Sequence, residues 1–148
     1  MTGPRDERGE SLLELMIAVA LMGIAVVAIM AGLTTSIMVS DIHRKQAVAA
    51  ATVRSYAEAV ENYVAGSGYQ ACASASSYAP STVGLLVPAG YAASASAASS
   101  WSGSTWVACS GDTGLQKITL TVSNGTRASE QLDVILRKPC RMADGTCS

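Results

Sequence analysis

One stretch decides the fold of this chain: Glu10-Ser-Leu-Leu-Glu14-Leu-Met-Ile-Ala-Val-Ala-Leu-Met-Gly-Ile-Ala-Val-Val-Ala-Ile-Met-Ala-Gly-Leu33. After Glu14 the stretch contains no charged residue. Because an α-helix rises 1.5 Å per residue, about 20 apolar residues are enough to cross the hydrocarbon core of a membrane. The stretch therefore predicts a single membrane-spanning helix.

The residues before this run indicate its orientation. Arg5 and Arg8 precede it, and no basic residue lies within it. Basic residues are kept on the cytoplasmic side of a membrane. We therefore predict a single-pass membrane protein, with its N-terminus in the cytoplasm and most of its 148 residues outside.

The composition indicates one domain attached to this helix. Hydrophobic residues make up 49% of the chain and charged residues only 14%, and the formal net charge is −1. A nearly neutral chain has no overall electrostatic attraction to nucleic acid. We therefore expect no nucleic acid among its partners.

Two common kinds of membrane segment, a secretory signal peptide and an ordinary signal anchor, could also explain the apolar run. A secretory signal peptide has an apolar core of about 7–15 residues, whereas this run is longer, and an Ala-x-Ala site at Ala49–Ala51 lies far beyond it. An ordinary signal anchor fits the length but gives Glu14 no role. A charged residue inside the bilayer costs about 2.5–3.5 kcal/mol on insertion scales. A helix N-terminus, or a new α-amine made by cutting after Gly9, would offset that cost.

The residues around the predicted cut carry a resemblance to a known family. The segment Gly9-Glu-Ser-Leu-Leu-Glu14-Leu resembles the signal of type IV prepilins and type II secretion pseudopilins. The resemblance covers roughly residues 5–65, and Glu10 stands where the family usually has Phe or Met.

This resemblance implies roles for three residues. Residues 1–9 would be a leader peptide that a prepilin peptidase removes by cutting after Gly9. Glu10 would become the new N-terminus and carry the N-methyl group. Glu14 would be the assembly carboxylate, which pairs with the N-terminus of a neighbouring subunit.

The helical pattern continues beyond the apolar run. Apolar residues recur at three- and four-residue steps, at Val53, Tyr56, Val60 and Tyr63. This spacing forms one apolar face, and Gly66 and Gly68 then end the helix. We therefore predict one helix with a transmembrane assembly half, residues 10–40, and an amphipathic half, residues 41–65, which belongs to an extracytoplasmic head, residues 41–148.

The last third of the chain predicts a sheet over residues 105–138. The strand candidates are Thr105–Ser110, Lys117–Ser123 and Gln131–Lys138, and Asn124-Gly125 is a strong hairpin signal between the last two. We expect these inward-facing residues: Ile118, Leu120, Val122, Leu132, Val134 and Leu136. The predicted fold is α+β, with the long helix packed on a small antiparallel meander of about three to four strands.

Between the helix and the sheet lies an uncharged region. No charged residue occurs between Glu61 and Asp112, and the region is rich in Ala, Ser and Gly. We predict a loop region, residues 66–104, with short irregular elements. It serves either as a neutral loop held by a disulfide or as a subunit-contact or adhesive surface.

Four cysteines lie in the predicted head: Cys72, Cys109, Cys140 and Cys147. An even number without a C-x-x-C pair, outside a membrane, favours disulfides over zinc. Three pairings are possible, and we favour Cys72–Cys109 with Cys140–Cys147, because Ala143-Asp144-Gly145 can turn within the second loop. The tail, residues 139–148, resembles the disulfide-bounded C-terminal region of many pilins.

The sequence gives no indication of an enzyme or a cofactor. His43 is the single histidine, and it lies beside Arg44 and Lys45, as expected of a solvated residue. Asp112, Asp133 and Asp144 are too far apart in sequence to indicate calcium. We therefore expect no catalytic residue, no metal and no cofactor.

The leading hypothesis is a structural subunit, major or minor, of a type IV pilus or a type II secretion-like filament. Its expected partners are other pilin subunits, the prepilin peptidase, the assembly platform and the membrane. The precursor would lie in the cytoplasmic membrane and the product in a filament at the cell surface. The alternative is a single-pass anchored binding or adhesion protein that does not polymerise.

Overall fold

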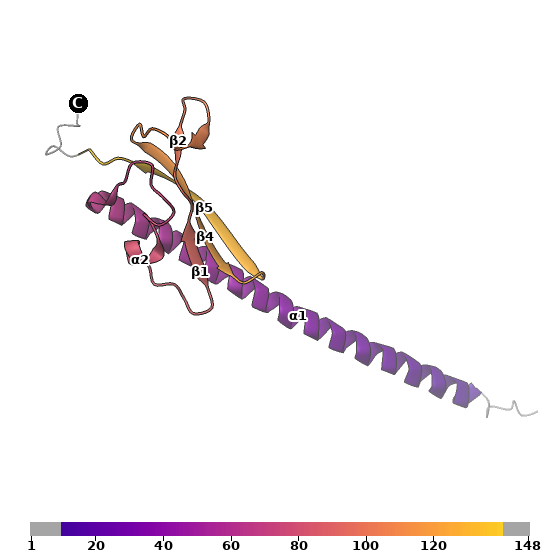
Figure 1. Cartoon of the computed structure of the whole chain (residues 1–148). Coiled ribbons are helices and arrows are strands. Elements are labelled where there is room, and N and C mark those ends of the chain that lie inside the picture. Colours follow the sequence, from indigo (N-terminus) through magenta and orange to yellow (C-terminus); the bar gives the residue numbers. More distant parts are fainter. Residues whose placement is uncertain (1–9, 141–148) are drawn as a thin grey trace, which may run out of the picture. The chain divides into compact units, whose positions relative to one another are not determined.

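The computed structural model describes residues 10–140, with side chains from residue 12 onward. The chain divides into two compact units, Met1–Asp41 and Ile42–Ser148, and each is described by itself. The elements in chain order are α1 (Glu10–Tyr63), a π-helical turn (Val64–Gly68), α2 (Pro80–Val83), β1 (Ala92–Ala95), β2 (Ser99–Trp101), β3 (Trp106–Ala108), β4 (Leu115–Asn124) and β5 (Ala128–Arg137) (Figure 1).

In the first unit, the chain is a continuous α-helix from Glu10 onward. Its many Ala, Leu and Met residues favour a helix, and no proline interrupts the chain between Pro4 and Pro80. The helix runs through Gly32 without a break. The hydroxyls of Thr34 and Thr35 donate to the carbonyl oxygens of Met30 and Ala31, at 2.9 and 3.0 Å.

In the second unit, the remainder of α1 packs on the sheet through the predicted apolar face. Val53, Tyr56 and Val60 are buried, and they share a core cluster with three residues of β4: Ile118, Leu120 and Val122. Each of these β4 side chains is 0% exposed. The alternation of β4 therefore determines which face of the sheet meets the helix, as the sequence predicts.

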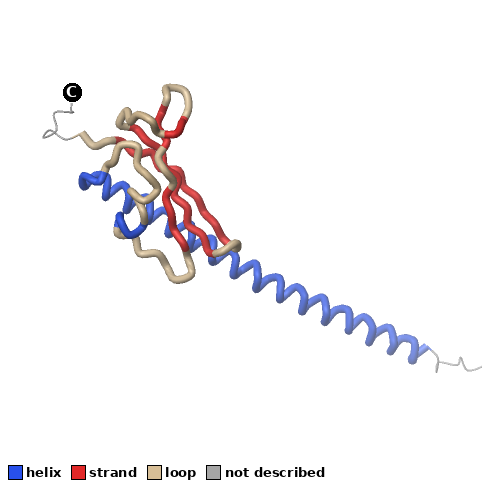
Figure 2. Tube along the Cα trace, in the orientation of Figure 1, coloured by secondary structure: helices blue, strands red, loops and turns tan. Residues whose placement is uncertain are grey.

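Within the described residues, five strands form one antiparallel sheet around β4 (Figure 2). β5 pairs with β4 along its whole length, from Leu115↔Arg137 to Asn124↔Ala128. β1 and β2 pair with separate parts of β4, at Leu120–Ser123 and at Gln116-Lys117. β3 pairs only with β2, as the return strand of a short hairpin.

The sheet differs from the predicted meander in two respects. The region 66–104, predicted as loop, contains α2, β1 and β2, so the sheet has five strands instead of three or four. The strand predicted at Thr105–Ser110 is shorter, and it pairs with β2 instead of β4. β1 and β2 contain mostly Ala and Ser, which give a weak strand signal because strand propensity reflects packing of larger side chains.

The inward face of β5 also differs from its prediction. Val134 and Leu136 are buried, as expected, but Leu132 is 36% exposed although it pairs with the fully buried Leu120. Among the described strands, β5 pairs only with β4, so it lies at an edge of the sheet. At an edge strand, alternation determines which face a side chain points to, but other residues do not necessarily bury that side chain. Leu132 accordingly lies outside the core cluster that contains Val134 and Leu136.

The helix ends in the Gly-rich segment that the sequence indicates. The regular α-helix stops at Tyr63, and Ser67 adopts a positive φ of 99°. A Cβ atom on Gly68 would overlap the ring of Tyr63, whereas a Cβ atom on Gly66 would meet nothing within 4 Å. The close approach of the chain to Tyr63 therefore requires glycine at position 68.

We predict that Gly68→Ala destabilises the head by roughly 1–3 kcal/mol, the usual cost of overpacking. The measurement is the free energy of unfolding, from urea titration of the full chain in detergent. Gly66→Ala is the matched control, and we expect it to be neutral or slightly stabilising. Equal effects of the two substitutions would contradict the close approach to Tyr63.

Candidate functional site

The N-terminal part of α1 carries the predicted assembly residues. Gly9 lies outside the described residues. Glu10 is the first residue of the helix, and the structure describes its backbone but not its side chain. Glu14 follows one turn later and is exposed. A carboxylate this close to a helix N-terminus is favoured by the positive end of the helix dipole.

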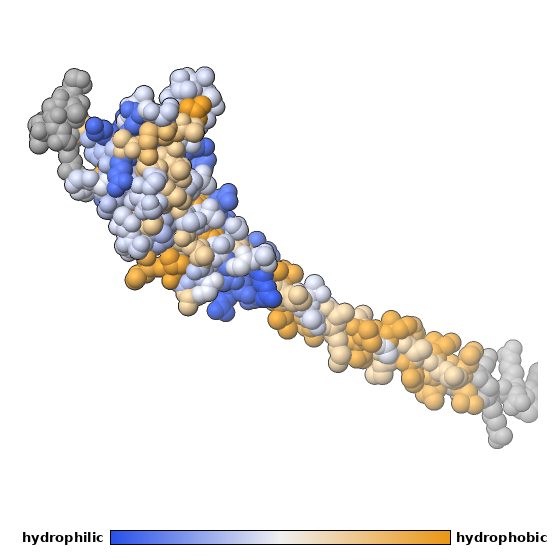
Figure 3. All heavy atoms as spheres, viewed as in Figure 1, coloured by the Kyte–Doolittle hydropathy of each residue, from blue (hydrophilic) through white to orange (hydrophobic). Residues whose placement is uncertain are grey.

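The helix around Glu14 exposes apolar side chains on all sides. Every residue from Leu12 to Arg44 is exposed, and large hydrophobic residues recur throughout this stretch. Figure 3 shows these hydrophobic atoms over the N-terminal part of α1. A helix that is apolar all round belongs in a membrane or in the interior of an assembly. By length and composition, this helix is sufficient to cross a membrane.

The polar groups within the apolar stretch are compatible with lipid. In a membrane, every polar group needs a partner within the protein. Thr34 and Thr35 meet this need by bonding to carbonyl oxygens one turn back.

Charged residues return at the end of the apolar stretch. After Glu14, the next charged residue in the sequence is Asp41, and Arg44 and Lys45 follow closely. His43 is exposed, as a solvated residue should be. Among residues 10–140, the structure contains no cluster of three or more His, Cys, Asp or Glu side chains that could hold a metal ion.

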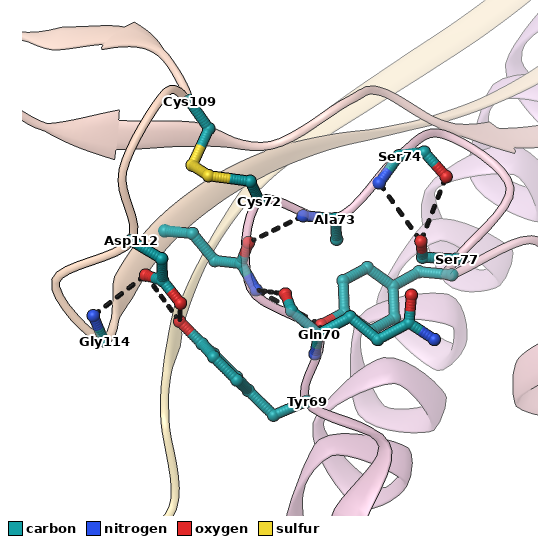
Figure 4. The surroundings of a disulfide bond; sticks show 11 residues. Tyr69, Gln70, Cys72, Ala73, Ser74, Ser77, Cys109, Asp112 and Gly114 are labelled. Atoms are coloured by element: carbon teal, nitrogen blue, oxygen red, sulfur yellow. Dashed lines mark hydrogen bonds between the residues drawn. A yellow bond between two sulfur atoms is a disulfide. The ribbon is translucent and has the colours of Figure 1, made fainter.

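The head is held together by a disulfide beside the sheet (Figure 4). Cys72, which follows the helix, is bonded to Cys109, which precedes β4, with their Cα atoms 5.2 Å apart. The favoured pairing of these two cysteines is thus present. Cys140 is also disulfide-bonded. The predicted partner, Cys147, lies outside the described residues, so that pairing stays a prediction.

A buried glutamine joins the segment after the helix to the sheet. Gln116 of β4 is 0% exposed. Its Oε1 accepts from the backbone N–H of Ala73 at 3.3 Å, and its Nε2 donates to the carbonyl of Gln70 at 3.0 Å and to the hydroxyl of Tyr78 at 3.2 Å. A buried amide with all these partners fixes the segment against β4.

Two tyrosines extend this network to the helix and to the loop before β4. The hydroxyl of Tyr56 on α1 donates to the carbonyl of Tyr78 at 2.6 Å. The hydroxyl of Tyr69 donates to the carboxylate of Asp112, 2.8 Å from Oδ2, and Asp112 Oδ1 accepts from the N–H of Gly114. Burial, and next the hydrogen bond to Asp112, raise the pKa of Tyr69.

The sequence analysis missed this network. Gln116 lies two residues before Ile118, which begins the alternating series Ile118, Leu120 and Val122. Extending this alternation by two residues toward the N-terminus places Gln116 on the inward face of the sheet. A polar residue at an inward position indicates that it has a buried partner. The partners themselves lie 38 to 46 residues away in the sequence, and no sequence pattern identifies them.

Comparison with protein families finds a match in the first part of the chain. The model described as the prokaryotic N-terminal methylation motif matches residues 4–30. The matched residues include Gly9, Glu10 and Glu14 and the start of the exposed apolar helix. Comparison with curated proteins and with solved structures finds no match.

We predict that the head loses stability between pH 10 and pH 12 through Tyr56. Burial raises its pKa to about 12, whereas an unfolded tyrosine ionises near pH 10. In this range the unfolded chain has released a proton that the folded chain still holds. The free energy of unfolding therefore falls as pH rises, by about 2–3 kcal/mol from this residue.

The measurement is urea unfolding of the wild type and of Tyr56→Phe at pH 7, 10 and 12. The variant starts less stable because it lacks the hydrogen bond to Tyr78. It should then lose less stability across the alkaline range than the wild type does. Parallel losses in the two proteins would contradict the role of Tyr56.

Proposed function

Because the chain carries the prepilin signature of type IV pilins and pseudopilins at residues 4–30, we propose that it is a structural subunit of a type IV pilus or a type II secretion-like filament. One observation carries the proposal: the matched segment coincides with a helix that is exposed and apolar all round and bears an exposed carboxylate at Glu14. Such a helix has to be covered, first by lipid and then by other subunits.

In the precursor, the apolar stretch of α1 spans the cytoplasmic membrane with its N-terminus inside. A prepilin peptidase cuts after Gly9, and the α-amine of Glu10 becomes the first group of the mature chain. This amine lies one helical turn from Glu14 along the chain. Two opposite charges in a medium of low dielectric constant attract strongly, and either one alone is costly.

Assembly then transfers the helix from lipid to a bundle of like helices. Lipid tails are as apolar as leucine, so packing between helices depends on close contact instead of a hydrophobic driving force. Small residues four apart allow such contact, and Ala28, Gly32 and Ser36 have this spacing. Gly23 and Gly32 have open space beside them in the single subunit.

The charge pair gives this bundle its register. A carboxylate at Glu14 that remains unpaired among apolar helices costs several kcal/mol. The amine of a neighbouring Glu10 removes that cost only at one axial offset between helices. We therefore assign Glu14 to assembly and Glu10 to the amine that receives it, with the assembly platform bringing the subunits together.

The head remains outside the membrane and forms the surface of the filament. Its Cys72–Cys109 disulfide suits an oxidising compartment. The prepilin motif belongs to structural proteins, and we propose no enzymatic activity for this chain. Its partners are other pilin subunits, the prepilin peptidase and the assembly platform.

We predict that Glu14→Ala leaves membrane insertion intact but abolishes incorporation into filaments. Removing the carboxylate makes the helix more apolar, so insertion does not suffer, whereas the amine of the neighbour loses its partner. The measurement compares the variant in membrane and sheared-filament fractions of the native host. Glu58→Ala, an exposed acid farther along α1, is the matched control. Normal incorporation of Glu14→Ala would refute the assembly role.

We also predict that the mature protein begins at Glu10. The intact mass of protein purified from native membranes or filaments should match residues 10–148 plus the net CH2 of one N-methylation, less four hydrogen atoms for two disulfides. A mass that retains residues 1–9 would favour an anchored binding protein that does not polymerise. A start after Ala51 would indicate a secreted protein.

A further inference from the structure

Both tryptophans of the chain lie on the outer face of the sheet. Trp101 of β2 and Trp106 of β3 are direct cross-strand partners, with ring centroids 5.3 Å apart in an edge-to-face arrangement. In the same register, Ser99 pairs with Lys117 of β4, so these side chains share the face opposite the core. Trp101 is 38% exposed, a large apolar surface for a residue of this size.

Charged and hydroxyl groups border the two indoles. The Lys117 ammonium lies 5.8 Å from the centroid of the Trp106 ring and 3.2 Å from Asp133 Oδ2. The hydroxyl of Thr119 donates to Asp133 Oδ1 at 2.6 Å. We call the surface formed by Trp101, Trp106, Lys117, Thr119 and Asp133 the tryptophan face.

This polar border has unused hydrogen-bonding capacity. An ammonium has three donors, and each carboxylate oxygen can accept two hydrogen bonds. The side chains of Lys117 and Asp133 are 27% and 53% exposed, so a ligand can reach them. The tryptophan face thus combines flat aromatic surface with strong donors and acceptors on adjacent strands.

Charge and polarity narrow the class of ligand. Lys117 and Asp133 neutralise each other, and the hairpin loop between the tryptophans carries only serine, glycine and threonine. On the same outward face, Arg137 pairs with Leu115, two residues from Lys117, and adds one positive charge. A polyanion such as nucleic acid binds through several such charges. A purely apolar partner would bury the ion pair without replacing its water, which is costly.

An uncharged sugar ring needs no positive surface, and its hydroxyls can replace the water around the ion pair. Rings of the glucose and N-acetylglucosamine type hold their hydroxyls equatorially, which leaves flat faces of C–H groups. Such a face can stack on an exposed indole while the hydroxyls at its edge exchange hydrogen bonds with an ammonium and a carboxylate. Sites for small ligands commonly combine apolar surface with a few well-placed polar groups in this way.

We propose that the tryptophan face binds an uncharged glycan of β-linked glucose-type rings. Cross-strand contact between the two indoles also stabilises the hairpin. That contact alone does not require a neutral ion pair on β4 and β5 beside the rings. The inference is independent of filament assembly, because every residue of the face belongs to the head.

The experiment uses the full chain in detergent micelles and its own fluorescence. Trp101 and Trp106 are the only tryptophans in the sequence, so emission reports the tryptophan face directly. The probes are the neutral hexasaccharides of β-1,4-linked glucose and of β-1,4-linked N-acetylglucosamine. We expect a saturable change in emission with at least one of them, insensitive to added salt because the ligand is uncharged.

Substitutions on and away from the tryptophan face then show where the sugar binds, and urea titration shows that each variant is folded. Trp101→Ala should weaken binding by about tenfold or more, and Asp133→Asn should weaken it less. Leu86→Ala removes an equally apolar side chain that is 92% exposed elsewhere on the head, and it should bind like the wild type. Variants are compared only where urea titration shows a folded head.

Three results would overturn the proposal. One is the absence of a saturable change with both hexasaccharides. Another is equal affinity of wild type and a folded Trp101→Ala. The third is a change that occurs with a DNA oligonucleotide or with increasing protein concentration but not with either sugar, which would assign the face to nucleic acid or to a second copy of the chain.

Discussion

The rest of the structure depends on one constraint, which is that the first part of α1 cannot remain in water. Its apolar side chains are exposed in every direction from Leu12 onward. No rearrangement of a single helix can hide a surface that surrounds it, so cover has to come from lipid or from other helices. Glu14 is the charged residue in this surface before Asp41. In the proposed assembly, its charge favours one particular arrangement of those helices.

The head meets a different problem, because its core is small. One face of α1 and one face of β4 provide most of the large buried side chains, and the segments that follow the helix contribute mainly Ala and Ser. Small domains commonly supplement such a core with covalent links. Here the Cys72–Cys109 bond restricts the conformations of the unfolded chain. In the chain-entropy model this raises the free energy of unfolding by about 4 kcal/mol. The hydrogen bonds of Gln116 fix the same segment to β4 in the folded state.

The parts of this fold that could be predicted are those with a strong local signal. The apolar run, the alternation of Ile118, Leu120 and Val122, and the turn at Asn124-Gly125 each identify their element. β1 and β2 could not be found in this way, since they form by backbone pairing to β4 and carry few large side chains. Likewise, the position of Gln116 is visible in the alternation, but its partners become neighbours only in the folded chain. The family comparison supports the prepilin resemblance at residues 4–30, and the roles of Gly9 and Glu10 that this resemblance implies stay predictions.

The distribution of charge in the chain bears on the proposed filament. A filament places many copies of one surface side by side, so any net charge on a subunit repels its neighbours. The formal net charge is −1, and the proposed cut removes two positive and two negative residues, Arg5, Asp6, Glu7 and Arg8, which leaves it unchanged. In addition, the sequence from Asn62 to Gly111 has no charged residue at all. In the proposed filament, neighbouring heads would therefore meet only weak long-range repulsion, and contacts between them would depend on shape and hydrogen bonding.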